Sequence, residues 1–190
     1  MGKETNPRTL SEEIKQAAAG LGFDACGVAS AEKAIDPDNR LGDWLARGYH
    51  ADMAWMADTQ AVRQDVQRKL PGTRSVVVVA RDYYSERPPM PKNVGRVSRY
   101  AWGRDYHRVL HKPLRKLARA IETLAPGSAT YCCIDTGPVL EKFWAVRAGI
   151  GWTGKNSLVL RRDRGSWFFL GVILTTAVIE PDQPVQEGCG

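Results

Sequence analysis

The sequence predicts an α+β protein in which a layered, mixed sheet is flanked by helices. Helical periodicity appears in residues 9–21 and 105–124, and strand-like apolar runs appear in residues 25–29, 75–80 and 129–134. The strands are scattered among the helices rather than alternating strictly with them, and one β-hairpin is expected near the end of the chain. With 190 residues and no internal repeat, one main domain is expected.

The composition is that of a basic globular protein. Hydrophobic residues make up 43% and charged residues 25% of the chain, and 27 Lys and Arg stand against 21 Asp and Glu. No apolar run is long enough to cross a bilayer, and the first eight residues lack the apolar core of a signal peptide. A cytoplasmic protein without a membrane segment is therefore expected, and its positive charge favours a polyanionic partner.

The first third of the chain predicts a helix, a strand and a second helix. Thr9-Leu-Ser-Glu12 has the pattern of a capping box, and glycines 20 and 22 end the helix that follows. Residues 25–29 predict a short strand, and Leu41–Leu45 a short amphipathic helix. The segment Gly48–Met56 is rich in aromatic residues and methionine. It either closes over the core, which is the favoured interpretation, or lines a pocket for a large flat ligand.

The middle of the chain predicts the best strand and the longest helix. Ser75–Ala80 contains four consecutive valines and should be covered on both faces. Asp105 is expected to cap a helix whose leucines and isoleucine form a buried stripe, with a kink or a later start at Pro113. The basic remainder of this helix is either solvated or follows a nucleic-acid backbone. Cationic and aromatic residues mix in Arg96–Arg104, which suits a phosphate-bearing or ring-stacking partner.

Residues 135–156 predict the functional site. Asp135 follows the strand at residues 129–134, and Pro138 suits the first turn of a helix, so Asp135 is expected where strand passes into helix. Helix N-capping is the simpler alternative role for this carboxylate. Gly149 and Gly151 are expected to supply the positive φ that ends the helix, and a loop follows at once.

The last part of the chain predicts the hairpin. Residues 157–160 and 166–174 are apolar runs on either side of Arg162-Asp-Arg-Gly165, which favours a tight turn. The four cysteines include no C-x-x-C pair, so a zinc site has no support. Cys26, Cys132 and Cys133 are interpreted as small core residues.

Five segments, in this order, carry a family resemblance: residues 97–107, 135–141, 148–156, 165–171 and 187–190. Together they resemble epoxyqueuosine reductase, the cobalamin and iron–sulfur enzyme of tRNA queuosine synthesis. The resemblance implies that residues 1–180 form a cobalamin-binding catalytic domain similar to that of reductive dehalogenases. It also implies that residues 181–190 are the start of a truncated 4Fe-4S ferredoxin-like segment. In the family, this segment is followed by a helical-repeat part that binds tRNA.

The resemblance also assigns roles to residues. Asp135 becomes the proton donor when reduced cobalamin opens the epoxide and water is lost, and Cys189 becomes the first cysteine of a cluster-binding run. A general acid must keep its proton near neutral pH, whereas a helix N-terminus favours the ionised form, so Asp135 would need dry surroundings. Aromatic residues at positions 143, 144 and 152 could supply them. The cobalamin contacts implied by motif are Ser98, Asp105, Asp135, Lys155, Asn156, Ser157, Val159 and Leu170.

Two positions depart from the family pattern. Asp58 stands where many members have arginine, and Arg63 could replace that contact with the corrin. Asn156 stands where some members have histidine. Asp105-Tyr-His107-Arg-Val-Leu110 resembles the D-x-H-x-x-G signature of proteins that give histidine to cobalt, but Leu110 replaces the glycine. A base-off cobalamin without a protein histidine on cobalt is therefore expected.

The resemblance further implies that tRNA carrying epoxyqueuosine binds mainly through the C-terminal part of the family. As it stands, the chain is expected to be a monomer, to bind no cluster and to need an external electron donor for turnover. A standalone cobalamin carrier or sensor is the alternative. A flavin nitroreductase-like domain is less well supported, because no flavin phosphate motif appears.

Overall fold

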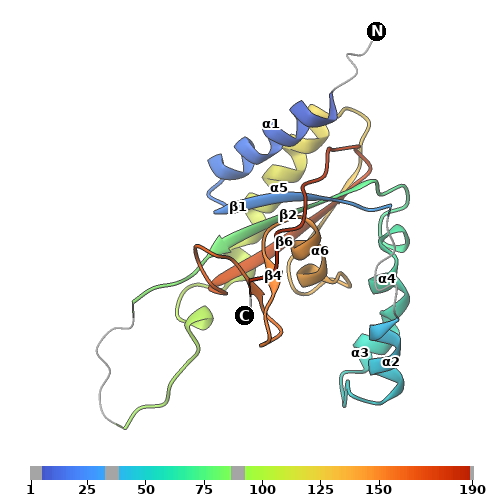
Figure 1. Ribbon diagram of the computed structural model, residues 1–190. Coiled ribbons are helices and arrows are strands. Elements are labelled where there is room, and N and C mark those ends of the chain that lie inside the picture. The colour runs from blue at the N-terminus through green and yellow to red at the C-terminus, as the bar shows by residue number, and fades with distance from the viewer. Residues whose placement is uncertain (1–5, 33–38, 87–92, 189–190) are drawn as a thin grey trace.

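A four-stranded antiparallel sheet forms the centre of the computed structural model, which describes residues 6–32, 39–86 and 93–188 (Figure 1). Its strands are β1 (Ala25–Ser30), β2 (Ser75–Asp82), β3 (Thr130–Cys133) and β6 (Phe168–Thr175), in the order β1-β2-β6-β3. The predicted α+β class with flanking helices is confirmed. The sheet is not mixed as predicted, since each of its pairings is antiparallel.

Strand β2 is an inner strand, and its first six residues are buried. Val77 pairs with Ile173 of β6, and Val78 pairs with Gly27 of β1. Because successive side chains alternate between the faces, Val77 and Val79 join one hydrophobic cluster while Val76 and Val78 join the other. The prediction that this strand is covered on both faces is confirmed.

Helices α1 (Pro7–Gly20) and α5 (Tyr106–Leu124) cover one face of the sheet (Figure 1). Leu114 and Ile121 of α5 are fully buried, and Ile14 of α1 belongs to the same cluster. Asp105 caps α5, as predicted, because its carboxylate accepts the backbone N–H of His107 at 3.0 Å. The expected later start at Pro113 is wrong, since α5 runs through this residue.

Helix α1 begins earlier than its sequence pattern suggests. Its N-cap is Asn6, whose side-chain oxygen accepts the backbone N–H of Arg8 at 3.0 Å, and Pro7 occupies the first helical position. The predicted capping box at Thr9–Glu12 is therefore wrong. Proline has its φ already set for a helix and lacks an N–H, so it starts the helix upstream of the box.

The opposite face of the sheet is covered by α6 (Glu141–Arg147) and by a small two-stranded sheet, β4 (Trp152–Thr153) with β5 (Val159–Leu160). Trp144 of α6 is fully buried there. The predicted hairpin is wrong in its partners: β5 pairs with β4, while β6 pairs with β2 and β3. An isolated bridge between Arg161 and Gly165 closes the predicted turn.

A group of short helices lies beside the sheet: α2 (Arg40–Ala46), α3 (Ala54–Asp58), α4 (Gln60–Gln64) and η1 (Val66–Arg68). The predicted helix at Leu41–Leu45 is confirmed within α2. In the segment Gly48–Met56, Tyr49 and Trp55 are 60% and 54% exposed. The favoured interpretation, that this segment closes over the core, is wrong, and contact with a flat ligand stays a prediction.

Residues 180–188 run across the edge of the sheet without a regular element. Asp182 accepts the backbone N–H of Val28 at 2.9 Å and lies 2.5 Å from the ammonium group of Lys15. The start of the segment assigned to the ferredoxin-like unit is therefore bound to β1 and α1. Cys189 lies outside the described residues.

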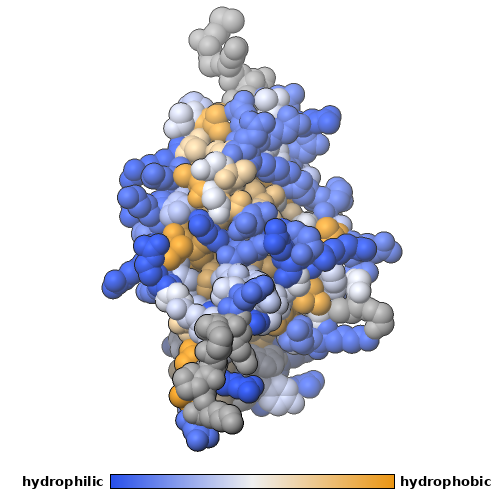
Figure 2. All heavy atoms as spheres, turned by 90° about the vertical axis from the view of Figure 1, so that its left-hand side faces the viewer, coloured by the Kyte–Doolittle hydropathy of each residue, from blue (hydrophilic) through white to orange (hydrophobic). Residues whose placement is uncertain are grey.

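Polar side chains dominate the face of the molecule seen in Figure 2, with hydrophobic atoms showing between them. Within residues 6–32, 39–86 and 93–188, no helix combines the length and the apolar character needed to cross a membrane.

Candidate active site

Asp135 lies in a strained turn directly after β3. Its φ is 55°, and the N–H of Thr136 donates to the carbonyl of Ile134 at 2.5 Å, so the chain reverses around the aspartate. Non-glycine residues rarely adopt this left-handed conformation, and such strain concentrates at functional sites. The turn holds the carboxylate out from the sheet, and 67% of the Asp135 side chain is exposed.

The prediction that Asp135 lies at a direct junction of strand and helix is wrong. Helix α6 begins at Glu141 rather than near Pro138, and the N–H of Val139 donates to the carbonyl of Gly137 in a second tight turn. Pro138 is therefore part of a connecting segment, and Asp135 caps no helix. The expected conflict between a general acid and a helix N-terminus does not follow from the backbone position of Asp135.

Tyr106 and His107, the first residues of α5, both face Asp135. The Tyr106 hydroxyl donates to Asp135 Oδ2 at 2.7 Å, and His107 Nε2 lies 3.6 Å from the same oxygen. The Tyr106 ring stacks on Phe169 of β6, with 4.4 Å between the ring centres and 7° between the ring planes. It also stacks on the His107 ring, whose centre is 4.1 Å away. Burial first and the hydrogen bond to Asp135 second raise the pKa of Tyr106, so this phenol is a fixed donor at neutral pH.

Asp105 holds the other side of the His107 ring. Its Oδ1 lies 2.9 Å from His107 Nδ1 and also accepts the backbone N–H of that residue. The side-chain hydrogen bond is the main cause that lowers the pKa of Asp105, so the carboxylate stays ionised. Asp105, His107, Tyr106 and Asp135 therefore form one contiguous cluster.

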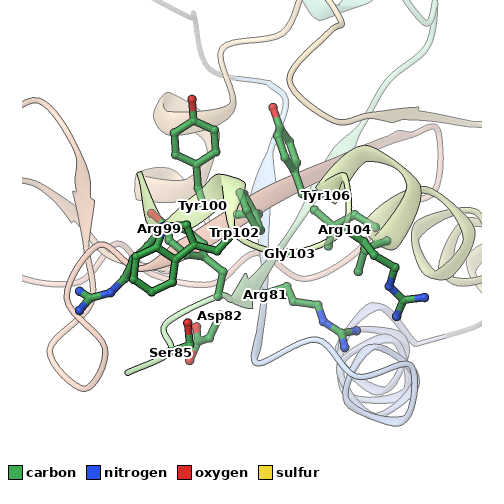
Figure 3. Close-up of a pocket in the computed structure, with 13 residues that line it drawn as sticks. Arg81, Asp82, Ser85, Arg99, Tyr100, Trp102, Gly103, Arg104 and Tyr106 are labelled. Carbon is green, nitrogen blue, oxygen red and sulfur yellow. The ribbon is translucent and has the colours of Figure 1, made fainter. Parts of the chain in front are cut away.

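A pocket of about 270 Å³ opens beside Tyr106, between the end of β2, η2 (Arg99–Ala101) and the start of α5 (Figure 3). Tyr100 and Tyr106 point their hydroxyl groups the same way, while Arg81 and Arg104 extend to one side of the pocket and Arg99 to the other. The Arg99 guanidinium lies 5.5 Å from the centre of the Trp102 ring. The mixture of cations and aromatic rings predicted for residues 96–104 is thus brought together in space.

A second loop, residues 153–158, contains three of the predicted cofactor contacts. Ser157 has a φ of 64°, and the N–H of Leu158 donates to Asn156 Oδ1 at 3.1 Å. Of the two glycines expected to end the preceding helix by positive φ, only Gly149 has one, at 71°. Gly151 is needed for close packing instead, because a Cβ there would lie 2.2 Å from the carbonyl oxygen of Leu160.

The N-terminus of α6 joins the two loops. The Glu141 carboxylate accepts the thiol of Cys133 at 3.4 Å, next to the Asp135 turn, and the Lys142 ammonium donates to the carbonyl of Ser157 at 3.0 Å. Burial raises the pKa of Glu141. Burial and the neighbouring Glu141 carboxylate together raise the pKa of Cys133 to about 12. Val159 is buried on the α6 face of the sheet, and Leu170 packs against the same cluster.

The predicted site residues therefore fall into groups. Asp135 and Asp105 both lie close to the His107 ring. Lys155, Asn156 and Ser157 are exposed in the second loop, where Lys142 donates to the carbonyl of Ser157. Ser98 is exposed and makes no side-chain capping bond at the start of η2. Asp58 is exposed in α3, which Figure 1 draws at the right, opposite the segment 93–101 at the lower left.

The Arg63 side chain is buried, with 8% exposure. It donates to Thr59 Oγ1 at 3.0 Å and lies over the Trp55 ring. Its suggested role in place of Asp58 stays a prediction. Sequence reasoning gave no role to Tyr106 or Glu141 and considered His107 only as a cobalt ligand. In the part of the chain that the structure describes, no three His, Cys, Asp or Glu side chains form a metal site.

Comparison with known proteins identifies relatives along the chain. The family model described as "Epoxyqueuosine reductase QueG, DUF1730" matches residues 63–136. An epoxyqueuosine reductase of Gloeobacter violaceus is 48% identical over 180 residues, which cover 94% of this chain and 56% of the relative. The chain thus spans about half the length of the curated relatives it matches.

Solved structures agree with these relatives. A crystal structure of epoxyqueuosine reductase with a tRNA-Tyr epoxyqueuosine-modified stem loop superposes with a TM-score of 0.87 and 29% identity, covering 97% of this chain and 50% of that one. A structure of a B12-dependent reductive dehalogenase superposes with a TM-score of 0.58 and 20% identity, covering 96% of this chain and 22% of that one. This second likeness shows a shared fold.

Proposed function

Because the chain matches epoxyqueuosine reductases over nearly its whole length, it belongs to that family, and we propose that it forms the cobalamin-binding part of an enzyme that reduces epoxyqueuosine to queuosine in tRNA. The single observation that carries the proposal is the strained Asp135 turn, whose carboxylate meets Tyr106 and His107 beside an arginine- and aromatic-lined pocket. The alternative of a standalone carrier or sensor gains no support from the relatives.

The reaction needs a group that protonates oxygen. Reduction of an epoxide to an olefin consumes two electrons and two protons, and the epoxide oxygen leaves as water. Bound cobalamin would supply the reducing chemistry. Asp135 would give a proton to the departing oxygen, since its exposed carboxyl group stands where a substrate can reach it, and Tyr106 would hold that group in place through a fixed hydrogen bond.

The residues of the two loops fit a large macrocycle fringed with amide groups. Such a cofactor needs exposed polar groups around an apolar surface. Loop 153–158 exposes Lys155, Asn156 and Ser157 together with the apolar Leu158, and Lys142 fixes its backbone from α6. Val159 and Leu170 lie in and against the buried cluster behind this loop. These residues would bind the corrin, and Ser98, Asp105 and Asp58 are the contacts that this geometry supports least.

Further parts of the proposal concern the state of the cofactor and its partners. The cobalamin would be base-off without a protein histidine on cobalt. The orientation of His107 supports this, because Asp105 binds its Nδ1 and its buried Nε2 faces Asp135. The chain would be a cytoplasmic monomer that receives electrons from an external donor. Cys189 would begin a 4Fe-4S segment that residues 181–190 alone do not complete, so no cluster and no unaided turnover are proposed for the chain.

Two measurements test the proposal. Titration with cob(II)alamin should give the base-off absorption shift at a one-to-one ratio, without nitrogen superhyperfine coupling from imidazole in the electron paramagnetic resonance spectrum. The loaded protein, with titanium(III) citrate as electron donor, should convert epoxyqueuosine in tRNA to queuosine. Asp135→Asn should bind cobalamin normally and lose about a hundredfold or more in rate. Failure to bind cobalamin, or an Asn variant as fast as the wild type, would refute the proposal.

A further inference from the structure

His107 lies between two carboxylates in the first turn of α5. Its Nδ1 is 2.9 Å from Asp105 Oδ1, and its Nε2 is 3.6 Å from Asp135 Oδ2. The Nε2 atom is buried and has no hydrogen-bond partner, because 3.6 Å is too long for such a bond. Catalytic contacts are often this long before substrate binds and shorten afterwards. The ring thus presents one unsatisfied nitrogen to the proposed proton donor.

Asp105 decides which nitrogen of His107 carries the permanent hydrogen. An ionised carboxylate only accepts hydrogen bonds, so the hydrogen between Asp105 and His107 must belong to Nδ1. Nε2 is then the nitrogen that gains and loses a proton, and this is the nitrogen that faces Asp135. Asp105 is therefore a positioning residue for the ring.

The phenol and the two thiols near His107 keep their protons at neutral pH. The pKa of Tyr106 is raised by burial, so its phenol donates a hydrogen bond but does not release the proton. His107 also lines a pocket of about 200 Å³ with His111, Tyr131 and two cysteines, and burial raises the pKa of Cys132 to about 11 and of Cys133 to about 12. Arg108 faces Asp105 rather than the ring. Imidazole is the side chain that ordinarily exchanges protons near neutrality.

The stoichiometry of the reaction calls for a second proton at one place. The epoxide oxygen leaves as water and so takes up two protons, whereas Asp135 holds only one. A bound substrate would cover the exposed carboxyl group and separate it from solvent. We propose that His107 stores the second proton and passes it from Nε2 to Asp135 within the same turnover. This inference rests on the proposed role of Asp135 as proton donor.

Each turnover uses two protons and two electrons. The carboxyl group of Asp135 gives its proton to the oxygen as the first carbon–oxygen bond breaks. The imidazolium of His107 then gives its Nε2 proton to the Asp135 carboxylate, which delivers it as the second carbon–oxygen bond breaks and water forms. The two electrons come from the reduced cofactor of the proposed function. Once product leaves, the 67% exposed Asp135 side chain takes up two protons from solvent in turn, and the first passes on to the buried Nε2 of His107.

The orientation of the ring can be tested without cofactor or RNA. The chain has three histidines, so nitrogen-15 correlation spectra of its imidazoles can be assigned by the signal lost in His107→Gln. Neutral His107 should carry its hydrogen on Nδ1. Asp105→Ser, which keeps a capping hydroxyl, should shift it toward Nε2 and leave His111 unchanged. A wild-type His107 with its hydrogen on Nε2, or no change in Asp105→Ser, would overturn the proposal.

The proton transfer is tested with the cobalamin-loaded protein, titanium(III) citrate and tRNA carrying epoxyqueuosine. His107→Gln should slow turnover by about 10- to 100-fold at unchanged KM, and added imidazole should restore part of the rate. His111→Gln, on the next turn of α5, is the matched control and should keep the wild-type rate. A His107→Gln rate equal to wild type, or no rescue by imidazole, would overturn the proposal. If the wild type itself binds no cobalamin or converts no substrate, the proposed function fails instead, and the nitrogen-15 spectra still report on the ring.

Discussion

Replacing Gly27 with alanine should destabilise the fold more than a similar change elsewhere in the sheet. Gly27 lies in β1, on the face covered by α6, and a Cβ there would lie 2.0 Å from the carbonyl oxygen of Ala148. That oxygen belongs to the backbone at the end of α6, so it cannot rotate away as a side chain would. Relief of the clash requires α6 or β1 to move by about an ångström, and overpacking of this kind costs about 3 kcal/mol at its upper end.

Gly171→Ala is the matched control. Gly171 is also buried, in β6, but its Cβ would meet Val79 Cγ2 at 3.1 Å and Leu114 Cδ1 at 3.2 Å, and these methyl groups can shift. We expect this variant to lose less than about 1 kcal/mol. In a chain of this size, Gly27→Ala should lower the melting temperature by about 6–12 °C.

Thermal and urea unfolding, followed by circular dichroism, measure the difference. Equal losses for the two variants, or a Gly27→Ala protein within about 0.5 kcal/mol of wild type, would show that β1 and α6 are not in rigid contact. Since α6 carries Glu141 and Lys142, displacement of the helix should also weaken cobalamin binding in the Gly27 variant and not in the Gly171 variant.

Three further predictions concern single groups. Tyr106→Phe keeps the ring stack on Phe169 but removes the donor to Asp135, so turnover should fall about 10-fold while the melting temperature stays within a few degrees; a wild-type rate would contradict the role of the hydroxyl. Lys142→Met should weaken cobalamin binding in the titration, and Lys116→Met, on the exposed side of α5, should not. Burial raises the pKa of Cys26 to about 12, so at pH 8 to 9 the folded protein should present far fewer thiolates at Cys26 than an ordinary cysteine does. Its alkylation by iodoacetamide at about pH 8.5, mapped by mass spectrometry, should therefore be much slower in the folded protein than in the urea-unfolded protein; equal rates would refute the burial argument.

Local patterns predicted most of the elements because burial imposes a period on the sequence. The four valines of β2 and the stripe from Leu110 to Ile121 in α5 are each buried as expected. The capping box failed for a local reason as well, since the stronger start signal, Asn6 followed by Pro7, lies upstream of it.

Strand pairing could not be predicted from the neighbouring sequence. The turn at Arg162–Gly165 forms a bridge as its residues suggest, yet β6 leaves this turn to make an eight-residue ladder with β2. Such a ladder joins residues about ninety positions apart, and the turn chemistry contains no information about it. The error therefore lay in the partner and not in the strand.

The site was half predicted for a similar reason. Asp135 was singled out by its position at the end of a strand, but its contacts with Tyr106 and His107 come from another element. The signal that could have found them is the cap at Asp105, because a capped helix fixes the next two residues in its first turn. The start of α6 was missed because Pro138 lies in a turn that the chain needs before Glu141.

The order β1-β2-β6-β3 has a consequence for the synthesis of the protein. Of the four strands in this sheet, β6 is the last to leave the ribosome, yet it is the one that joins β2 to β3. Until residues 168–175 emerge, β2 offers an unpaired edge rich in valine, which is the kind of segment that aggregates or recruits chaperones. The long sequence separation also predicts slow refolding with a yield that falls as protein concentration rises. Production of this protein should therefore benefit from slow translation and from chaperones.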